Sequence, residues 1–173
     1  RRKMISHLRA YHGNTIASAS LSGMHYNHAS FGLPLDGFLH VTPPHHYRYS
    51  QENEDEDMFT SRLADELEAM ILKEGPDTIA AFFTEPIMGA GGVIVPPDTY
   101  YEKIQVVLKK YDILLVADEV ITAFGRTGNM FGTTTMKLVP DMIVCAKGLS
   151  SAYLPISALM INERIFREMK EKS

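Results

Sequence analysis

The sequence has a single cysteine, no tryptophan and no apolar run long enough to span a bilayer. Cys145 alone excludes an internal disulfide and is typical of a reducing compartment, so we expect a cytoplasmic protein with no membrane contact. No signal-peptide pattern opens the chain. The 17 Lys and Arg residues against 21 Asp and Glu residues give a net charge of −4, with no basic stripe. That balance argues against nucleic acid as a partner.

The residues that are present form the mixture of a globular domain, with 45% hydrophobic and 22% charged residues. A length of 173 residues corresponds to one domain. The chain begins Arg1-Arg2-Lys3 rather than with Met, and it ends in a charged run, 162–173, that resembles a helix. We therefore expect a piece of a longer protein.

The first 46 residues contain all seven histidines and little helical periodicity, which predicts irregular functional loops. The acidic run Glu52–Asp57 is typical of a helix start, because acids suit the positive end of the helix dipole. Apolar residues recur at helical spacing from Phe59 to Ile71, and Gly75-Pro76 then ends the predicted helix.

From there the chain alternates between predicted strands and helices. The strands are expected at Thr78–Glu85, Ile113–Asp118, Met142–Ala146 and Ile156–Ile161, the last three of them buried. The helices are expected at Thr99–Tyr111 and Glu163–Lys172. Nearly continuous apolar strands separated by helices predict an α/β fold, with a mostly parallel sheet covered by helices on both faces.

Charged residues follow these strands: Glu85 after the first, Asp118 after the second and Lys147 after the third. In open α/β sheets ligands lie beyond the carboxyl ends of the strands, so the topology brings two acids and an amine to one place. Each has an ordinary structural alternative: Asp118 as a helix cap, Glu85 as a turn residue, and Lys147 as the partner of an acid. At the end of a buried strand, Lys147 is expected to be desolvated, which lowers the pKa of an amine and makes it a nucleophile.

Three chemistries use a lysine and an acid at such a cluster. A P-loop ATPase requires a Gly-Lys pair, which the chain lacks. A dinucleotide site requires a glycine where Ile94 stands in the run 89–94. Pyridoxal phosphate requires a lysine for its Schiff base and an acid against its pyridine nitrogen, and both are present.

At these residues the sequence resembles the class III pyridoxal-phosphate aminotransferases, which include ω-amino-acid:pyruvate and diamine transaminases. The matching segments are 11–13 (YHG), 85–92 (EPIMGAGG), 115–128 (LVADEVITAFGRTG) and 140–150 (PDMIVCAKGLS). The resemblance covers nearly the whole chain and implies that residues 1–173 are part of the large domain of a fold type I enzyme. It also implies that an N-terminal region, with its phosphate-binding Gly-Ser segment, and a C-terminal small domain lie outside the sequence.

The resemblance implies a role for each matching side chain. Lys147 would form the Schiff base and move the substrate proton, and Asp118 would keep the pyridine nitrogen protonated. Val120 would press on one face of the ring, and Tyr11, for which a core aromatic is the alternative, would stack on the other. His12 and Gly13 would line the loop beside the ring, Glu85 would lie on the substrate side, and Arg126 would be structural.

The implied reaction transfers an amino group from an amine or ω-amino acid to a keto acid such as pyruvate, in a parent protein that is a homodimer. The alternatives are an aminomutase of the same family and a catalytically incomplete chain. The sequence departs from the family at Met88, at Ala123 and in the turn 151–153, but none of these removes a catalytic group. His25, His28 and the pair His45-His46 lack a matched second pair, so no metal site is expected.

Overall fold

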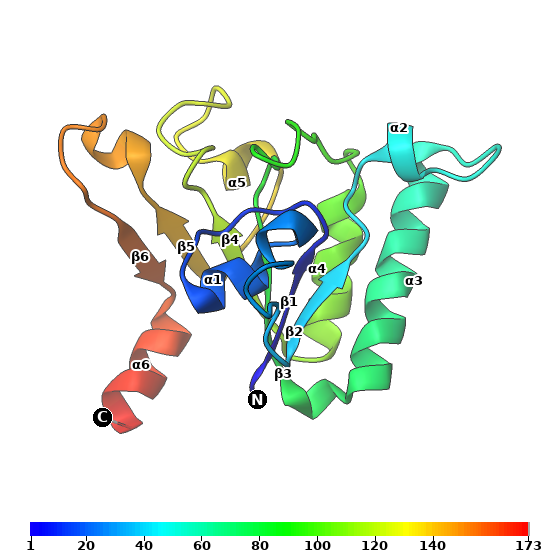
Figure 1. The fold of residues 1–173 in the computed structure, drawn as a ribbon, viewed down its shortest axis with the longest axis horizontal. Helices are drawn as coiled ribbons and strands as arrows, with labels where there is room; N and C mark the ends of the chain where they lie inside the picture. Colours follow the sequence, from blue (N-terminus) through cyan, green and yellow to red (C-terminus); the bar gives the residue numbers. More distant parts are fainter. Residues whose placement is uncertain (173) are drawn as a thin grey trace.

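The computed structural model describes residues 1–172 as one six-stranded sheet flanked by helices (Figure 1). The strands are β1 (Lys3–His7), β2 (Phe38–Val41), β3 (Ile79–Thr84), β4 (Leu114–Asp118), β5 (Met142–Cys145) and β6 (Ala158–Ile161). The α-helices are α1 (Ile16–Leu21), α2 (His46–Tyr49), α3 (Glu56–Glu74), α4 (Tyr100–Lys110), α5 (Gly132–Thr135) and α6 (Glu163–Lys172). Short 3-10 helices lie at His25–Asn27, Pro76–Thr78 and Lys147–Ser150.

The strands lie in the order β2-β1-β3-β4-β5-β6. The first five are mutually parallel, and β6 pairs antiparallel with β5. The carboxyl ends of the parallel strands therefore meet at one edge of the sheet, whereas β6 ends at the opposite edge. This confirms the predicted α/β fold with a mostly parallel sheet.

Helices α3 and α4 cover one face of the sheet. Their apolar side chains form the main core with Ile5, Phe82 and Leu115 from three neighbouring strands. Because side chains alternate along a strand, Ser6 points to the other face, where its hydroxyl donates to the Leu21 carbonyl of α1. The helices therefore lie on both faces, as predicted.

Local sequence signals set the ends of α3. The Asp55 side chain accepts the Met58 N–H at 2.8 Å, and Glu56 and Asp57 occupy the first turn. Gly75, with a φ of 88°, ends the helix in a backbone conformation that favours glycine. The expected helix start in the acidic run is confirmed. No helix in the described part of the chain is long and apolar enough to cross a membrane.

The prediction that the first 46 residues are irregular loops is wrong for β1 and β2. Strand β1 lies between β2 and β3, well inside the sheet. Its pattern is not apolar, because Ser6 and His7 are fully buried. The Nε2 atom of His7 lies 2.6 Å from the Tyr100 hydroxyl, within hydrogen-bond distance. Partners far away in the sequence therefore stabilise this polar strand, and the local sequence pattern does not show them.

The prediction of a buried strand at Ile156–Ile161 is also wrong in part. The strand is shorter, and Leu159 and Met160 are exposed, because β6 is the edge of the sheet and lacks a covering layer within residues 1–172. The predicted helix that follows it is confirmed as α6.

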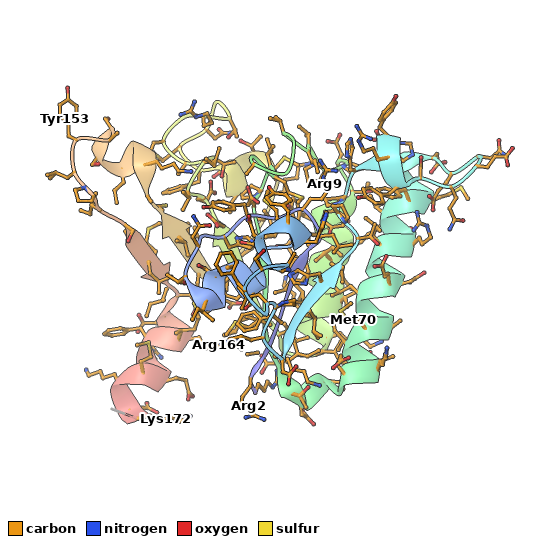
Figure 2. The ribbon with its side chains drawn as sticks, in the orientation of Figure 1. Arg2, Arg9, Met70, Tyr153, Arg164 and Lys172 are labelled. Carbon is orange, nitrogen blue, oxygen red and sulfur yellow. The ribbon has the colours of Figure 1, made fainter. Side chains whose placement is uncertain are left out.

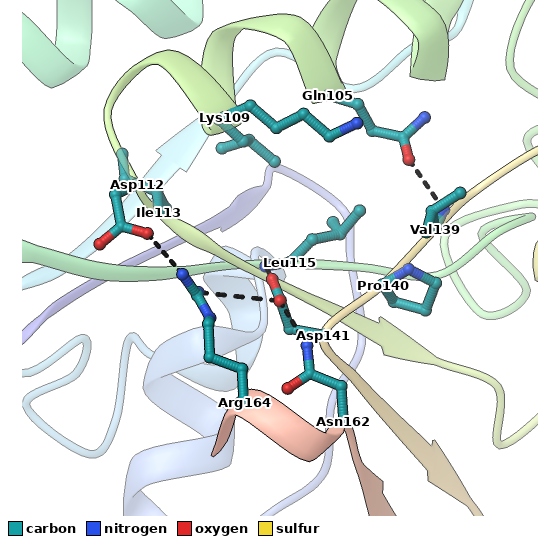
Figure 3. A pocket seen from close by; sticks show the side chains of 11 residues that line it. Gln105, Lys109, Asp112, Ile113, Leu115, Val139, Pro140, Asp141, Asn162 and Arg164 are labelled. Carbon is teal, nitrogen blue, oxygen red and sulfur yellow. Dashed lines mark hydrogen bonds and ion pairs between the residues drawn. The ribbon is translucent and has the colours of Figure 1, made fainter. Parts of the chain in front are cut away.

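Helix α6 is anchored at the amino ends of β4 and β5 (Figure 3). Arg164 lies 2.8 Å from Asp112 Oδ1 and 3.8 Å from Asp141 Oδ1, and Asn162 Nδ2 donates to Asp141 at 2.7 Å. These side chains line a cavity of about 430 Å³. The two acids that line it are already paired with Arg164 and Asn162. These side chains therefore anchor α6 to the sheet.

Candidate active site

A second cavity, of about 220 Å³, lies at the carboxyl ends of the parallel strands. It contains every residue that the sequence predicted to bind the cofactor: Tyr11, His12, Glu85, Asp118, Val120 and Lys147. These residues come from the end of β4 and from the segments that follow β1, β3, β4 and β5, which the sheet order places side by side. The topology thus brings together an amine and two carboxyl groups far apart in sequence.

Asp118 is held by donors on both of its carboxylate oxygens. His12 Nδ1 lies 2.8 Å from Oδ2, and the Val120 backbone N–H donates to Oδ1 at 3.0 Å. The side chains of His12 and Asp118 are only 4% and 12% exposed. Since a carboxylate has about four acceptor positions, room remains for a further donor such as a protonated ring nitrogen.

His12 is fixed in turn by its own surroundings. Its backbone N–H donates to Ser22 Oγ at 2.8 Å, and its ring meets Phe83 edge to face, with centroids 6.2 Å apart. Because a carboxylate only accepts hydrogen bonds, Nδ1 carries the proton toward Asp118. Nε2 is buried with no hydrogen-bond partner among residues 1–172. His12 therefore orients Asp118 instead of merely lining a loop.

Glu85 joins two loops. Its Oε1 accepts the Tyr11 N–H at 3.1 Å and its Oε2 accepts the Gly89 N–H at 2.8 Å. Burial raises the pKa of its carboxyl above the ordinary 4.5, and the two N–H donors oppose that rise. Glu85 thus fixes the loop that carries Tyr11 and His12 against the turn at Gly89, and it also lines the cavity.

Lys147 differs from the sequence-based expectation. Its side chain is exposed, so the desolvation argued from a buried strand end is wrong. It takes part in none of the ion pairs formed within residues 1–172, and Asp118 pairs with His12 instead. Its backbone has a φ of 46°, a left-handed conformation that costs a non-glycine residue about 1 kcal/mol or more. The amine is therefore free to react, on a strained backbone.

Tyr11 and Val120 are half-buried and line the same cavity. Their stacking on two faces of a ring stays a prediction. Gly13, expected beside the ring, also lines the cavity. Arg126 lies exposed in the loop after β4, and its structural role stays a prediction.

Sequence reasoning missed further residues. Ala90 and Ile121 line the cavity, although no chemical signal marks either one. Glu119 is fully buried, and it accepts the N–H groups of Gly132 and Thr133 at 2.9 and 2.6 Å. The pair of adjacent acids Asp118 and Glu119 at the end of a predicted strand is the sequence signal that could have indicated a role for Glu119. Within residues 1–172 no group of three His, Cys, Asp or Glu side chains is placed to hold a metal ion.

The side chains present fit a cofactor with an aldehyde and a basic ring nitrogen. An amine is needed to bind the aldehyde and an acceptor to face the nitrogen, and Lys147 and the unfilled positions on Asp118 supply them. Cys145, the nearest nucleophile on β5, is buried, and burial raises the pKa of its thiol. It is a packing residue.

Comparison with known proteins agrees with this chemistry. A probable gamma-aminobutyrate transaminase 3, mitochondrial, of Oryza sativa subsp. indica is 56% identical over 165 residues, which are 95% of this chain and 32% of that protein. The gamma aminobutyrate transaminase 1, mitochondrial, of Solanum lycopersicum is 54% identical over 165 residues, with the same coverage of each chain. This chain thus spans about a third of the length of these curated relatives.

Solved structures match as closely. A structure described as a transaminase with L-ala superposes with a TM-score of 0.98 at 61% identity, covering 100% of this chain and 41% of that one. The omega transaminase from Pseudomonas jessenii in complex with PMP gives 0.98 at 58% identity, covering 99% and 38%. The family model for Aminotransferase class-III matches residues 1–173. The chain therefore belongs to the class III aminotransferases, a family that uses pyridoxal 5'-phosphate.

Proposed function

We propose that these residues are part of the cofactor-binding large domain of a transaminase. The whole protein moves an amino group from an amine or ω-amino acid to a keto acid such as pyruvate. The observation that carries the proposal is the single cavity of about 220 Å³ that both the Lys147 amine and the Asp118 carboxylate line. Relatives named gamma-aminobutyrate transaminases support an ω-amino acid as donor, and a neighbour described with L-ala supports pyruvate as acceptor.

Bound pyridoxal phosphate supplies an aldehyde and an electron-withdrawing pyridinium ring. Lys147 would hold the aldehyde through its side-chain amine and, when released, would move the proton of the substrate Cα to the cofactor. Asp118 would hold the ring nitrogen and stabilise its positive charge, from a position that His12 and the Val120 backbone N–H fix. Tyr11 and Val120 line the cavity and would hold the ring between them.

The proposal extends to the assembly. The segment that follows Tyr11, His12 and Gly13 in the chain carries four large apolar side chains that are exposed: Ile16, Tyr26, Phe31 and Leu35. They line an adjoining cavity of about 470 Å³. Apolar surface of this kind is typical of a contact between subunits, which supports a homodimer. Cytoplasmic localisation rests on the single cysteine alone.

The first experiment tests the cofactor lysine in the whole protein. Loaded with pyridoxal phosphate, the wild type is expected to show the visible absorbance of the lysine-bound cofactor. Lys147→Ala is expected to lose it, while Lys137→Ala, an exposed lysine away from the cavity, retains it. An unchanged band in Lys147→Ala would overturn the proposal.

The second experiment tests the reaction. The whole protein is incubated with gamma-aminobutyrate and either pyruvate or 2-oxoglutarate, and the amino acid formed from the acceptor is measured. Alanine from pyruvate is the expected product. Product that keeps the donor's own carbon skeleton with a relocated amino group would favour an aminomutase instead. Residues 1–173 expressed alone are expected to be inactive.

A further inference from the structure

The loop that follows Asp118 is closed by hydrogen bonds between its first and its last residues. The Glu119 carboxylate accepts the N–H groups of Gly132 and Thr133, and the Glu119 carbonyl accepts the Ala123 N–H at 3.0 Å. Residues 119–133 thus form a loop closed on the residue next to Asp118. The loop lies at the edge of the sheet where β4 and β5 end, beside the turn that begins at Lys147 (Figure 1).

Phe124 reaches from this loop to the lysine turn. A Cβ built on Gly148 would lie 3.0 Å from Phe124 Cδ2 and 3.5 Å from its Cβ, so the ring already contacts the Gly148 backbone. Phe124 is 38% exposed, and two contacts hold it there. Its N–H donates to the Met130 carbonyl at 2.6 Å, and its ring lies 6.3 Å from that of Phe131. Phe124 itself has a φ of 63°, a conformation that its surroundings must maintain.

The lysine turn needs such support. Lys147, Ser151 and Ala152 all have left-handed φ values, of 46°, 50° and 65°. Most of the turn is exposed, as Tyr153 at the far end shows (Figure 2). Strained backbone of this kind persists only where neighbouring structure imposes it. The ring of Phe124 against Gly148 is such a neighbour, and Phe124 stands on the loop 119–133, which begins directly after Asp118.

We propose that Phe124 is a positioning residue for Lys147. Its contact with Gly148 couples the lysine turn to the loop closed on Glu119, and so sets the distance between the Lys147 amine and the Asp118 carboxylate. The inference rests on the proposed role of Lys147 in holding the cofactor. Phe124 is not among the residues that line the cavity, so it acts through Lys147.

The test compares Phe124→Ala with Phe124→Tyr in the whole protein loaded with pyridoxal phosphate. Phe124→Ala is expected to lower kcat about ten- to hundredfold, with KM within about twofold of wild type, because a misplaced reacting group affects the chemical step. The midpoint of the pH titration of the cofactor's visible absorbance is expected to differ between Phe124→Ala and the wild type. Phe124→Tyr, which keeps the ring, restores both. Met130→Ala, an exposed side chain of the same loop, serves as the control.

Gly148→Ala tests the same contact without removing the ring, since the new methyl group must displace Phe124 or the turn. It is expected to shift the absorbance titration in the wild type but not further in Phe124→Ala, because the two changes break one contact. Independent, additive shifts would overturn the inference, as would a wild-type titration in Phe124→Ala. Lys147→Ala separates the two proposals: if it keeps the band, the proposed function fails. If it loses the band while Phe124→Ala matches wild type, only the positioning role fails.

Discussion

The two sides of the cavity are built in opposite ways. On the carboxylate side, Glu85 and Asp118 line the cavity and Glu119 lies directly behind Asp118 in the chain. Each of the three accepts at least two hydrogen bonds, and Glu85 and Glu119 are buried. On the lysine side, residues 147–153 form an exposed turn with left-handed backbone at three positions. One side is fixed by hydrogen bonds to its carboxylates, and the other is an exposed turn with a strained backbone.

The difference matches what each side has to do. A group that stabilises charge works best when it is already oriented, because no free energy is then spent on reorienting it during the reaction. A lysine that first holds the cofactor and then carries a proton has to change position between the two tasks. A fixed acid and an exposed amine therefore suit one reaction.

The largest expected effect comes from changing the charge on the fixed side. Asp118→Asn in the whole protein keeps an oxygen for the Val120 N–H but removes the negative charge. We expect kcat to fall about a hundred- to a thousandfold, as for the loss of a preorganised electrostatic group. Steady-state kinetics measure this, with Asp98→Asn, an exposed acid, as control. A loss below tenfold would place the ring-stabilising charge elsewhere.

The next effect is on stability. Glu119→Gln leaves one of the N–H groups of Gly132 and Thr133 without its acceptor in a buried site. The free energy of unfolding is expected to fall by about 1–3 kcal/mol, the usual effect of an unsatisfied buried donor. The midpoint of thermal unfolding measures it. A midpoint equal to wild type would mean that the loop 119–133 is held by other contacts.

A smaller effect depends on pH. The folded pKa of Glu85 is raised above its unfolded value of 4.5, so Glu85 stabilises the fold most below pH 4.5. That contribution is lost as the pH rises through the folded pKa. Glu85→Gln does not titrate and is expected to lack this part of the pH dependence. Thermal midpoints measured from pH 4 upward for both proteins compare the two slopes, and parallel curves would contradict the prediction.

The smallest effect belongs to the lysine side. Ala152→Gly relieves a left-handed φ of 65° but adds freedom to the unfolded chain. The two changes oppose each other, so we expect a gain in stability below about 1 kcal/mol. Ala146→Gly, at an extended position with a φ of −156°, has no strain to relieve and is expected to lower stability. Equal effects of the two variants would mean that the turn is unstrained.

Much of the sheet could be predicted because apolar runs mark its middle strands. The ranges expected for β3, β4 and β5 agree with the structure to within a residue or so at each end, as does that for helix α4. Strand β1 could not be predicted, since its buried Ser6 and His7 are satisfied by partners far along the chain. Burial of β6 was wrongly expected, because an apolar strand at a sheet edge looks the same in sequence as one at the centre.

The candidate site divides in the same way. The strand-end argument predicted that Glu85, Asp118 and Lys147 would meet, because topology alone places them at one edge. The sequence could not predict that His12, and not Lys147, pairs with Asp118. That pairing depends on the orientation and burial of the side chains, which only the folded chain defines. The exposure of Lys147 was missed for the same reason.

The reversal of β6 has a practical consequence for protein engineering. Because this strand runs antiparallel to β5, helix α6 starts at the rim of the sheet opposite the reacting groups, anchored there through Arg164. A reporter, affinity handle or interdomain spacer grafted into α6 would stand a full strand length from the chemistry. Such a graft would leave the residues that line the cavity untouched.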